Sequence, residues 1–292
     1  TDNDLKFDYL GIKSLMNTYL LNHEVNRNKV ITELRYQMYS IVALFLADSF
    51  EDFSKIFIAL SDHKVSVATP VLLNAGTKNN SMISCSLNTL KDDSLEGIED
   101  TLKNISIMSS HGAGIGLYAG NLRSKETTYR NGKGNAGGHT KFAKMLDSKI
   151  RFYQQSSSRR GAVALYQDIW HKDILDHLQL RKQIREEMTA RDVFPAINIP
   201  DLFYKRLIDS MENNKPVNFS LFCPHESLKY IGKPLYETWG EEFEKLYTEL
   251  ELSDCSRTNI DVKELMLNVV TAQTETGTPY ILNRDTVNRG NM

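Results

Sequence analysis

The residue best suited to chemistry in this chain is a cysteine, Cys85, in the stretch 81–87 (SMISCSL). Serine hydroxyls flank the thiol on both sides, and a thiol needs polar neighbours and access to cycle between thiol and disulfide. A lone cysteine among apolar residues is, however, usually a small buried hydrophobic side chain. Disulfide formation also needs a second thiol, which Cys223 or Cys255 could provide only if the fold brought it close. The stretch therefore indicates a redox thiol whose partner lies either in this chain or outside it.

A carboxylate, Asp93, follows Cys85 by eight residues and precedes an apolar stripe at helical spacing. The stripe consists of Leu95, Ile98, Leu102 and Ile105. Asp93 and Glu96 have the spacing of a capping box, so the simplest interpretation is that Asp93 caps this helix. The same position also suits a ligand, because a carboxylate at a helix start can accept a hydrogen bond from a ribose hydroxyl while the free backbone N–H groups favour phosphate. Asp93 is therefore expected to be either a helix cap or the start of a nucleotide site.

Glycine-rich segments downstream are further candidates for ligand binding. The segment 109–116 (SSHGAGIG) does not have the spacing of a dinucleotide-binding fingerprint, and it runs from a helix into a strand. Two polar loops, 124–138 (SKETTYRNGKGNAGG) and 154–161 (QQSSSRRG), are typical of a protein surface. Loops of this kind also carry ligand sites when a rigid scaffold positions them.

Three arginines stand next to or within these loops, namely Arg123, Arg159 and Arg160. A guanidinium can bind a phosphate through two hydrogen bonds at once, although a single arginine is usually a solvated surface charge. His111 and His171 are expected to be structural. The sequence shows no Ser/His/Asp triad and no Cys/His cluster at metal-binding spacing, so we expect no metal site formed by the protein.

The elements that must position these residues follow from the hydrophobic pattern. Residues 1–62 are expected to be mostly helical, because apolar residues recur there near helical spacing. From residue 65 onward, short β-rich runs alternate with helical stripes. The expected strands are 65–69, 114–118, 162–166, 193–199, 218–222 and 280–282. Strands that alternate with helices predict an α/β fold with a mostly parallel sheet.

The composition limits the possible classes of function. The chain has 292 residues, 41% of them hydrophobic, and a formal net charge of -2. This charge argues against a nucleic-acid surface, which usually has a strong basic excess. No apolar run approaches the length of a membrane span, and the polar start TDND is unlike a signal peptide. Three distant cysteines without a CxxC pair favour a reducing cytoplasm.

Taken together, these segments resemble the large subunit of class I ribonucleotide reductase, and they follow the family's order across nearly the whole chain. The matching segments are 7–11 (FDYLG), 68–70 (ATP), 74–76 (NAG), 84–85 (SC), 91–98 (KDDSLEGI), 112–116 (GAGIG), 170–171 (WH), 190–192 (ARD), 199–203 (IPDLF), 220–226 (SLFCPHE), 239–247 (WGEEFEKLY) and 274–281 (TETGTPYI). The resemblance implies an α/β fold with a helical N-terminal region over 1–62. Residues 63–292 would then form the first half of a ten-stranded α/β barrel with the specificity-effector loops and half of the active site.

The resemblance also implies an activity, the thiyl-radical reduction of ribonucleoside diphosphates to 2′-deoxyribonucleoside diphosphates. Cys85 matches one of the two cysteines that supply the reducing electrons and end as a disulfide. The positions that match substrate contacts are Thr69, Ser84, Gly112, Ala113 and Gly114. The positions that match the allosteric site for a dNTP or ATP effector with Mg²⁺ are Asp93, Ser94, Arg123, Arg159 and Arg160.

The chain departs from the family pattern where the radical chemistry should be. The radical-bearing cysteine of the family lies in an Asn-x-Cys-x-Glu motif, and this sequence contains no such motif. The second redox cysteine, the radical-transfer tyrosines and the C-terminal shuttle cysteines are also expected later in the family's order. We therefore interpret the chain as the N-terminal fragment of a split large subunit, with a phage origin and the host cytoplasm as its location. A cut within a longer natural chain is the other interpretation.

The expected partners follow from the same resemblance. They are a C-terminal large-subunit fragment, a small subunit that holds the radical cofactor, a reductant of the thioredoxin or glutaredoxin type, and a second copy of the core in a homodimer. The fragment alone should be inactive, and neither nucleic acid nor membrane is expected as a partner. An alternative from another functional class is a non-catalytic nucleotide-binding regulator derived from the same fold.

Overall fold

The computed structural model describes residues 6–25, 28–31, 33–78, 81–125, 127–129, 134–153, 161–182 and 189–291. The chain divides into two compact units. The helical unit comprises Thr1–Ser86, Ser110–Gly114 and Gln154–Arg160. The sheet unit comprises Leu87–Ser109, Ile115–Tyr153 and Gly161–Met292. The division after residue 62 stays a prediction from the sequence.

The helical unit is built from short helices and one hairpin. Its elements are α1 (Tyr9–Ser14), the π-helix η2 (Leu15–Tyr19), β1 (Asn22–Val25), β2 (Asn28–Ile31), α2 (Arg35–Leu46), α3 (Phe50–Ser61) and α4 (Thr69–Asn74). Helices α2 and α3 pack together, and Val42, Leu60 and Ala75 form their buried centre. This unit therefore has a small core of its own.

The expectation of a mostly helical N-terminal region is confirmed, although residues 22–25 and 28–31 form the antiparallel pair β1–β2. The asparagines at positions 22 and 28 have low helix propensity, which agrees with this pair. One expectation fails in the helical unit. The expected strand 65–69 is irregular up to Ala68, and α4 begins at Thr69. Pro70 lies in the first turn of α4, where its fixed φ and missing N–H favour a helix start.

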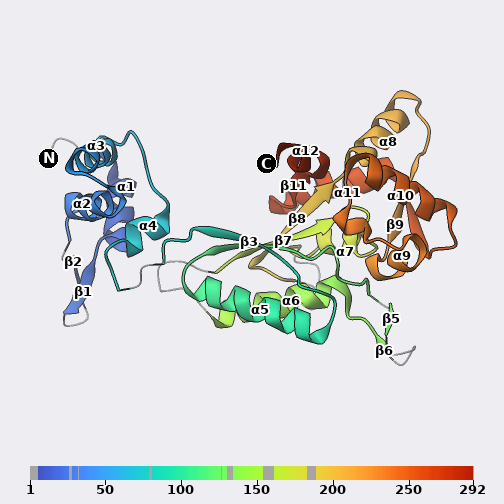
Figure 1. Cartoon of the computed structure of the whole chain (residues 1–292), viewed down its shortest axis with the longest axis horizontal. Helices are drawn as coiled ribbons and strands as arrows, with labels where there is room; N and C mark the ends of the chain where they lie inside the picture. Colours follow the sequence, from blue (N-terminus) through green and yellow to red (C-terminus); the bar gives the residue numbers. More distant parts are fainter. Residues whose placement is uncertain are drawn as a thin grey trace. The chain divides into compact units, whose positions relative to one another are not determined.

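The centre of the sheet unit is a five-stranded sheet in the order β11-β8-β7-β4-β3. Its strands are β3 (Cys85–Thr89), β4 (Gly114–Tyr118), β7 (Val163–Asp168), β8 (Val193–Ile199) and β11 (Tyr280–Asn283). The strand pairs β4–β7, β7–β8 and β8–β11 are all parallel. Helices α5 (Leu95–Ser110) and α6 (Gly138–Phe152) lie side by side along one face of this sheet (Figure 1). The α/β fold with a parallel sheet is thus confirmed.

Most of the remaining elements gather at the other end of the sheet unit, around α11 (Figure 1). They are α7 (Ile174–Leu178), α8 (Asp201–Glu212), β9 (Asn218–Phe222), α9 (Pro224–Ile231), η4 (Leu235–Glu237), α10 (Gly240–Leu252), β10 (Arg257–Asp261), α11 (Val262–Thr276) and α12 (Arg284–Gly290). The two short strands β5 (Thr128–Tyr129) and β6 (Gly134–Asn135) pair with one another apart from this group (Figure 1). The rings of Phe219, Phe222, Phe243 and Tyr247 pack together in the core. Residues 218–222 form a strand as expected, but β9 pairs antiparallel with β10 and does not join the five-stranded sheet.

The sequence missed strand β3, although the strands at β4, β7, β8 and β11 were expected close to their observed bounds. In β3 the exposed and half-buried residues alternate. Its exposed positions carry the different side chains of Cys85, Leu87 and Thr89, which do not form an apolar alternation. None of the described helices combines the length and the apolar composition needed to cross a membrane.

Candidate functional site

The thiol of Cys85 is exposed and stands at the first position of β3. The preceding residue, Ser84, accepts a hydrogen bond of 2.7 Å on its carbonyl oxygen from the N–H of Gly114. Its hydroxyl lies 3.8 Å from the sulfur of Cys85. The structure therefore brings Ser84, Cys85 and Gly114 together within the helical unit, as a thiol with hydroxyl and backbone groups around it.

Of the other residues expected to contact the substrate, Gly112 and Ala113 directly precede Gly114, whereas Thr69 lies in α4. Gly112 has a φ of +90°, which only glycine adopts at low cost, and it turns the chain from α5 into β4. Ala113 is buried between Gly112 and Gly114. Thr69 begins α4, and its hydroxyl lies 3.2 Å from the hydroxyl of Tyr19. Among the described residues, no hydrogen bond joins Thr69 to Ser84 or Cys85.

The two remaining cysteines are buried in the core of the sheet unit. The sulfur of Cys223 accepts hydrogen bonds from the Ser124 N–H at 3.5 Å and from the Thr127 hydroxyl at 3.3 Å. Cys255 is 3% exposed, and burial raises the pKa of its thiol. A buried thiol with a raised pKa forms little thiolate and is a poor redox group. Cys85 is therefore the cysteine that is available for chemistry.

Asp93 forms an ion pair with Arg123, which lies after β4. The Nε of Arg123 donates to the Asp93 carboxylate, and its Nη2 donates to the Asp93 carbonyl oxygen at 3.4 Å. The expectation that Asp93 caps α5 is wrong. The hydroxyl of Ser94 caps the helix instead, because it accepts a 3.0 Å hydrogen bond from the N–H of Gly97. The Asp93 carboxylate is thus held away from the helix end and toward Arg123.

A cavity of about 440 Å³ lies beside this ion pair, between α5 and α6, and is called the Asp93 cavity below. It is lined by Asp93, Ser94, Leu95, Ile98, Leu122, Arg123, Ala136, Gly137, Gly138, Lys141, Phe142 and Met145. Burial raises the pKa of Asp93, and the neighbouring Arg123 counteracts that rise. The cavity combines two cations, Arg123 and Lys141, with an apolar floor. These groups suit a ligand that has both an anionic part and a ring.

The start of α6 forms one wall of the Asp93 cavity because Gly138 permits a very close approach of other chain segments. Gly138 has a φ of +70°. A Cβ at this position would lie 2.6 Å from the Cβ of Lys125 and 2.7 Å from a carboxylate oxygen of Asp173. Both the backbone conformation and the available space therefore require glycine here.

Residues 154–160 of the polar loop 154–161 lie outside the described residues, and with them Arg159 and Arg160. Residues 126 and 130–133 of the loop 124–138 lie outside them as well. Of the five expected effector residues, the structure places Asp93, Ser94 and Arg123 around one cavity. Among the described residues, no three His, Cys, Asp or Glu side chains come together as a metal site.

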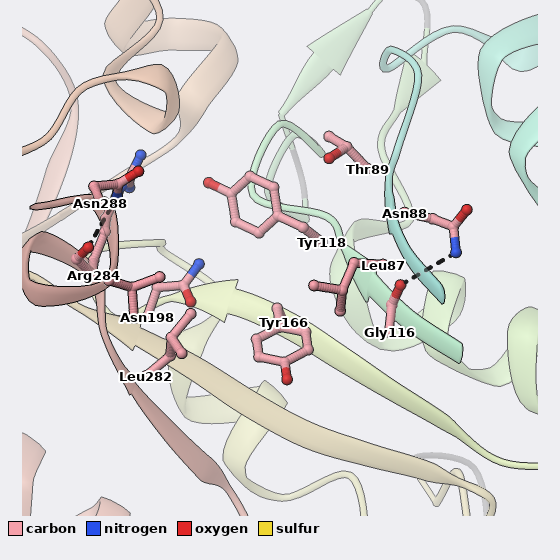
Figure 2. Close-up of a pocket in the computed structure, with 11 residues that line it drawn as sticks. Leu87, Asn88, Thr89, Gly116, Tyr118, Tyr166, Asn198, Leu282, Arg284 and Asn288 are labelled. Carbon is pink, nitrogen blue, oxygen red and sulfur yellow. Dashed lines mark hydrogen bonds between the residues drawn. The ribbon is translucent and has the colours of Figure 1, made fainter. Parts of the chain in front are cut away.

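A second cavity, of about 450 Å³, lies on the sheet and is called the sheet cavity below. Figure 2 shows Leu87, Thr89 and Tyr118 on one side of it, and Leu282, Arg284 and Asn288 on the other. Tyr166 from β7 and Asn198 from β8 lie between these two groups (Figure 2). The cavity is thus formed along the carboxyl-terminal parts of parallel strands, where ligands bind in open α/β sheets.

Sequence reasoning missed the buried ionic group beside the sheet cavity. The Asp168 carboxylate accepts a hydrogen bond of 2.5 Å from the Tyr118 hydroxyl and one of 3.0 Å from Arg284 Nη1. Arg284 also donates to the carbonyl oxygen of Tyr236. Asp168 has no exposed surface, and burial raises the pKa of Tyr118 well above its usual value. Asp168 is 50 positions from Tyr118 and 116 positions from Arg284 in the sequence, so no local motif could have revealed this ionic group.

Comparison with protein families assigns both parts of the chain. Residues 83–292 match the family described as ribonucleotide reductase, barrel domain, and residues 5–80 match ribonucleotide reductase, all-alpha domain. The chain is 34% identical to the ribonucleoside-diphosphate reductase large subunit of Arabidopsis thaliana over 290 residues, which cover 99% of this chain and 34% of that protein.

Similar identities are found in distant organisms. The chain is 36% identical to large chain 2 of the Saccharomyces cerevisiae enzyme, covering 99% of this chain and 32% of that protein. It is also 36% identical to subunit alpha of the Treponema pallidum enzyme, covering 99% of this chain and 34% of that protein. The chain thus spans about a third of the length of the curated relatives it matches.

Proposed function

This chain belongs to the ribonucleotide reductase large-subunit family, and on that premise we propose that it forms part of an enzyme that reduces ribonucleoside diphosphates to 2′-deoxyribonucleoside diphosphates. The observation that carries the proposal is the exposed thiol of Cys85 at the start of β3, within a chain that matches both family domains in order. The hydroxyl and backbone groups around that thiol are suited to hold the sugar and phosphates of a nucleotide.

In the proposed reaction, Cys85 is one of two thiols that supply electrons. The 2′ carbon–oxygen bond of the ribose breaks, and the oxygen leaves as water after it is protonated. The two thiols lose two hydrogens and form one disulfide, while the 2′ carbon gains a hydrogen in place of the hydroxyl. One ribonucleotide and two thiols thus give one deoxyribonucleotide, one disulfide and one water. A neutral, accessible thiol can both donate the proton and become a disulfide sulfur.

The second thiol and the radical-bearing cysteine would come from outside these 292 residues. Cys223 and Cys255 are poor candidates for the second thiol, because both are buried in the core of the sheet unit. The sequence has no other cysteine. We therefore assign the radical cysteine, which begins the family reaction at the 3′ carbon of the ribose, to a C-terminal large-subunit polypeptide. That the large subunit is split, and of phage type, stays a prediction.

The Asp93 cavity is the proposed site for the dNTP or ATP effector. Arg123 and Lys141 offer positive charge to the phosphates, and the Asp93 carboxylate can accept a hydrogen bond from the ribose. The apolar floor formed by residues such as Ile98 and Phe142 suits the face of a base. A Mg²⁺ ion would be carried by the nucleotide's own phosphates.

The remaining partners follow from the proposed reaction. A small subunit would hold the radical cofactor and generate the radical in the large subunit. The disulfide at Cys85 would be reduced by a dithiol protein of the thioredoxin or glutaredoxin type, which transfers two electrons by thiol–disulfide exchange. A homodimer of the core, formed near the effector site, completes the assembly that we propose.

The experiment that tests the role of Cys85 is a Cys85→Ser substitution in the complex of this chain with the C-terminal polypeptide and the small subunit. A serine cannot form a disulfide, so we expect CDP reduction over repeated turnovers to fall by at least about a thousandfold, in the range typical of lost catalytic nucleophiles. Binding of dTTP should stay unchanged, because the Asp93 cavity does not include Cys85. Product formation and nucleotide binding are measured on the same preparation.

The matched control is Cys255→Ser, which changes a buried cysteine of the same chain. It should retain repeated turnover once differences in folded fraction are corrected for. Normal turnover by Cys85→Ser would remove Cys85 from the reaction. Product from this chain and the small subunit alone would show that no C-terminal polypeptide is required. A complex that binds dTTP but never forms product would favour a nucleotide-binding regulator.

A further inference from the structure

A line of buried hydrogen-bonded groups connects the Asp93 cavity with the sheet cavity. It runs through the side chains of His177, His139 and Gln167 and continues through Asp168. None of these four side chains has exposed surface. Groups buried in this way have no water available to replace a lost partner, so each member depends on its neighbours.

The direction of every hydrogen bond in this line is determined. His177 Nε2 lies 3.0 Å from the Ala196 carbonyl oxygen and must donate to it, because a carbonyl only accepts. Burial lowers the pKa of His177 to about 4, so the ring is neutral at pH 7 and its Nδ1 accepts from His139 Nε2 at 2.7 Å. His139 Nδ1 therefore accepts from Gln167 Nε2 at 3.0 Å. The Gln167 Oε1 atom then accepts from the N–H of Asp168 at 2.9 Å.

Each end of this line reaches a cavity wall. His139 directly follows Gly138, which lines the Asp93 cavity at the start of α6. At the other end, the Asp168 carboxylate holds Tyr118 and Arg284, which both line the sheet cavity. In Figure 2 these two residues stand on opposite sides of the sheet cavity. A displacement of the α6 start would therefore move His139 and be transmitted to the groups that Asp168 holds.

A second set of buried hydrogen bonds holds the segments around Leu122 and the start of α6, which line the Asp93 cavity. The carbonyl oxygen of Leu122, a lining residue, accepts a 2.8 Å hydrogen bond from His171 Nε2. The Asp173 carboxylate accepts from the backbone N–H groups of both Lys125 and His139, each at 3.0 Å. Because Asp173 joins the loop at Lys125 to the start of α6, a ligand that moves either segment also shifts His139.

We propose that His139, Gln167 and Asp168 form a coupling relay, which carries nucleotide binding at the Asp93 cavity to Tyr118 and Arg284 at the sheet cavity. This inference rests on the proposed effector site and adds a route through the core that does not involve the loop 154–161. The relay has one arrangement of donors and acceptors, so a change at one end cannot be absorbed by reversing a single bond. Coupling of this kind requires a contiguous set of groups that both sites influence.

Hydrogen exchange read by mass spectrometry tests the relay on the full chain, with dTTP and Mg²⁺ as the probe. In the unaltered chain, dTTP should slow exchange at the Asp93 cavity, in residues 94–98 and 138–142. It should also slow exchange in α12, residues 284–290, by about fivefold, the lower end of usual coupling between sites. In Gln167→Leu the slowing at the Asp93 cavity should remain, and the slowing in α12 should disappear.

The matched control is Tyr247→Phe, which removes a buried hydroxyl bonded to Ser220, away from the relay. This variant should keep both responses. If Gln167→Leu does not fold, as judged by circular dichroism, Arg284→Gln takes its place, because it removes the ion pair that joins α12 to Asp168. It should likewise lose the α12 response.

The outcomes separate the relay from the nucleotide site it rests on. Slowing at the Asp93 cavity without any change in α12 of the unaltered chain would overturn the relay and leave the effector site standing. An α12 response of equal size in Gln167→Leu or its substitute would also overturn the relay. Absence of slowing at both places would reject the effector site together with the relay.

Discussion

The ion pair of Asp93 and Arg123 forms part of the wall of the cavity between α5 and α6. Their side chains are 15% and 19% exposed, so the pair is shielded from water and its interaction is stronger than that of a surface pair. Burial raises the pKa of Asp93, while the hydrogen bond and the charge of Arg123 oppose that rise. A ribose hydroxyl can bind this carboxylate while phosphates bind the outer face of the guanidinium. Arg123 would then bind both the Asp93 carboxylate and the phosphates of the nucleotide.

Replacing Arg123 with glutamine tests this arrangement at the residue scale. The variant removes a charge-assisted hydrogen-bond donor worth about 1.5–3 kcal/mol, so the Kd for dTTP should rise roughly 10- to 100-fold. Isothermal titration calorimetry on the folded variant measures this change. The control is Arg257→Gln, since Arg257 donates to the Ser253 carbonyl oxygen and does not line the cavity. Equal weakening by both substitutions, or none by Arg123→Gln, would contradict the assigned site.

Single residues of the site could be inferred from the sequence only where a local pattern or the family order pointed to them. Cys85 and Arg123 were expected in this way, and the structure describes both. The cap of α5 was assigned to Asp93 instead of Ser94, because neighbouring Asp and Ser residues are equally good caps. The Asp93 carboxylate pairs with Arg123 instead of capping the helix. This contact joins residues that are 30 positions apart in the sequence, so no local pattern could reveal it.

Among the elements, α6, α7 and the turn before α7 each hold one buried histidine. His139, His171 and His177 are fully buried, and burial lowers the pKa of each. His139 and His177 contact one another directly, while Asp173 donates its N–H to the ring of His171. Neutral rings are needed for these bonds, since an added proton would place two donors face to face.

The buried rings predict a loss of stability in mild acid. His177 has a pKa of about 4 in the folded chain and an ordinary value near 6.5 when unfolded. Between about pH 6.5 and pH 4 the unfolded chain binds a proton that the folded chain does not, so stability is complete above this range and falls as the pH drops. The difference corresponds to about 3 kcal/mol for this one residue.

Urea unfolding at pH 7.5 and at pH 5 measures this loss. In His177→Gln the amide can still donate to the Ala196 carbonyl oxygen and accept from His139, but it cannot bind a proton at these pH values. The free energy of unfolding should therefore fall less between pH 7.5 and pH 5 in this variant than in the unaltered chain. An identical fall in both proteins would show that His177 does not contribute.

Elements were predicted well where their pattern was strong and local. Residues 193–199 are mostly apolar and show little alternation between apolar and polar side chains, as expected of a buried parallel strand. Strand β8 has the predicted bounds. Strand β3 was missed because its exposed positions include Cys85 and Leu87, and pairing in the sheet overrides their weak pattern. The pair of strands at residues 22–25 and 28–31 was missed for a similar reason, since a short two-stranded pair has little periodicity.

At the scale of the whole molecule, the five-stranded sheet has two edges in the part of the chain that the structure describes, β3 and β11. Open edges with unpaired backbone groups and exposed apolar side chains such as Leu87 and Ile281 are surfaces that proteins normally cover. The chain spans about a third of the length of the relatives it matches. These observations support the proposal that a further polypeptide segment pairs with this sheet.

We propose that Cys85 donates electrons to the nucleotide together with a thiol from outside the chain. A single turnover of CDP by the assembled enzyme without external reductant tests this proposal, when it is followed by acid quenching, alkylation of free thiols and peptide mass spectrometry. We expect one disulfide per deoxyribonucleotide formed, joining Cys85 to a cysteine of the C-terminal polypeptide, with Cys223 and Cys255 recovered as alkylated thiols. Formation of dCDP while Cys85 is recovered fully alkylated would exclude Cys85 as an electron donor.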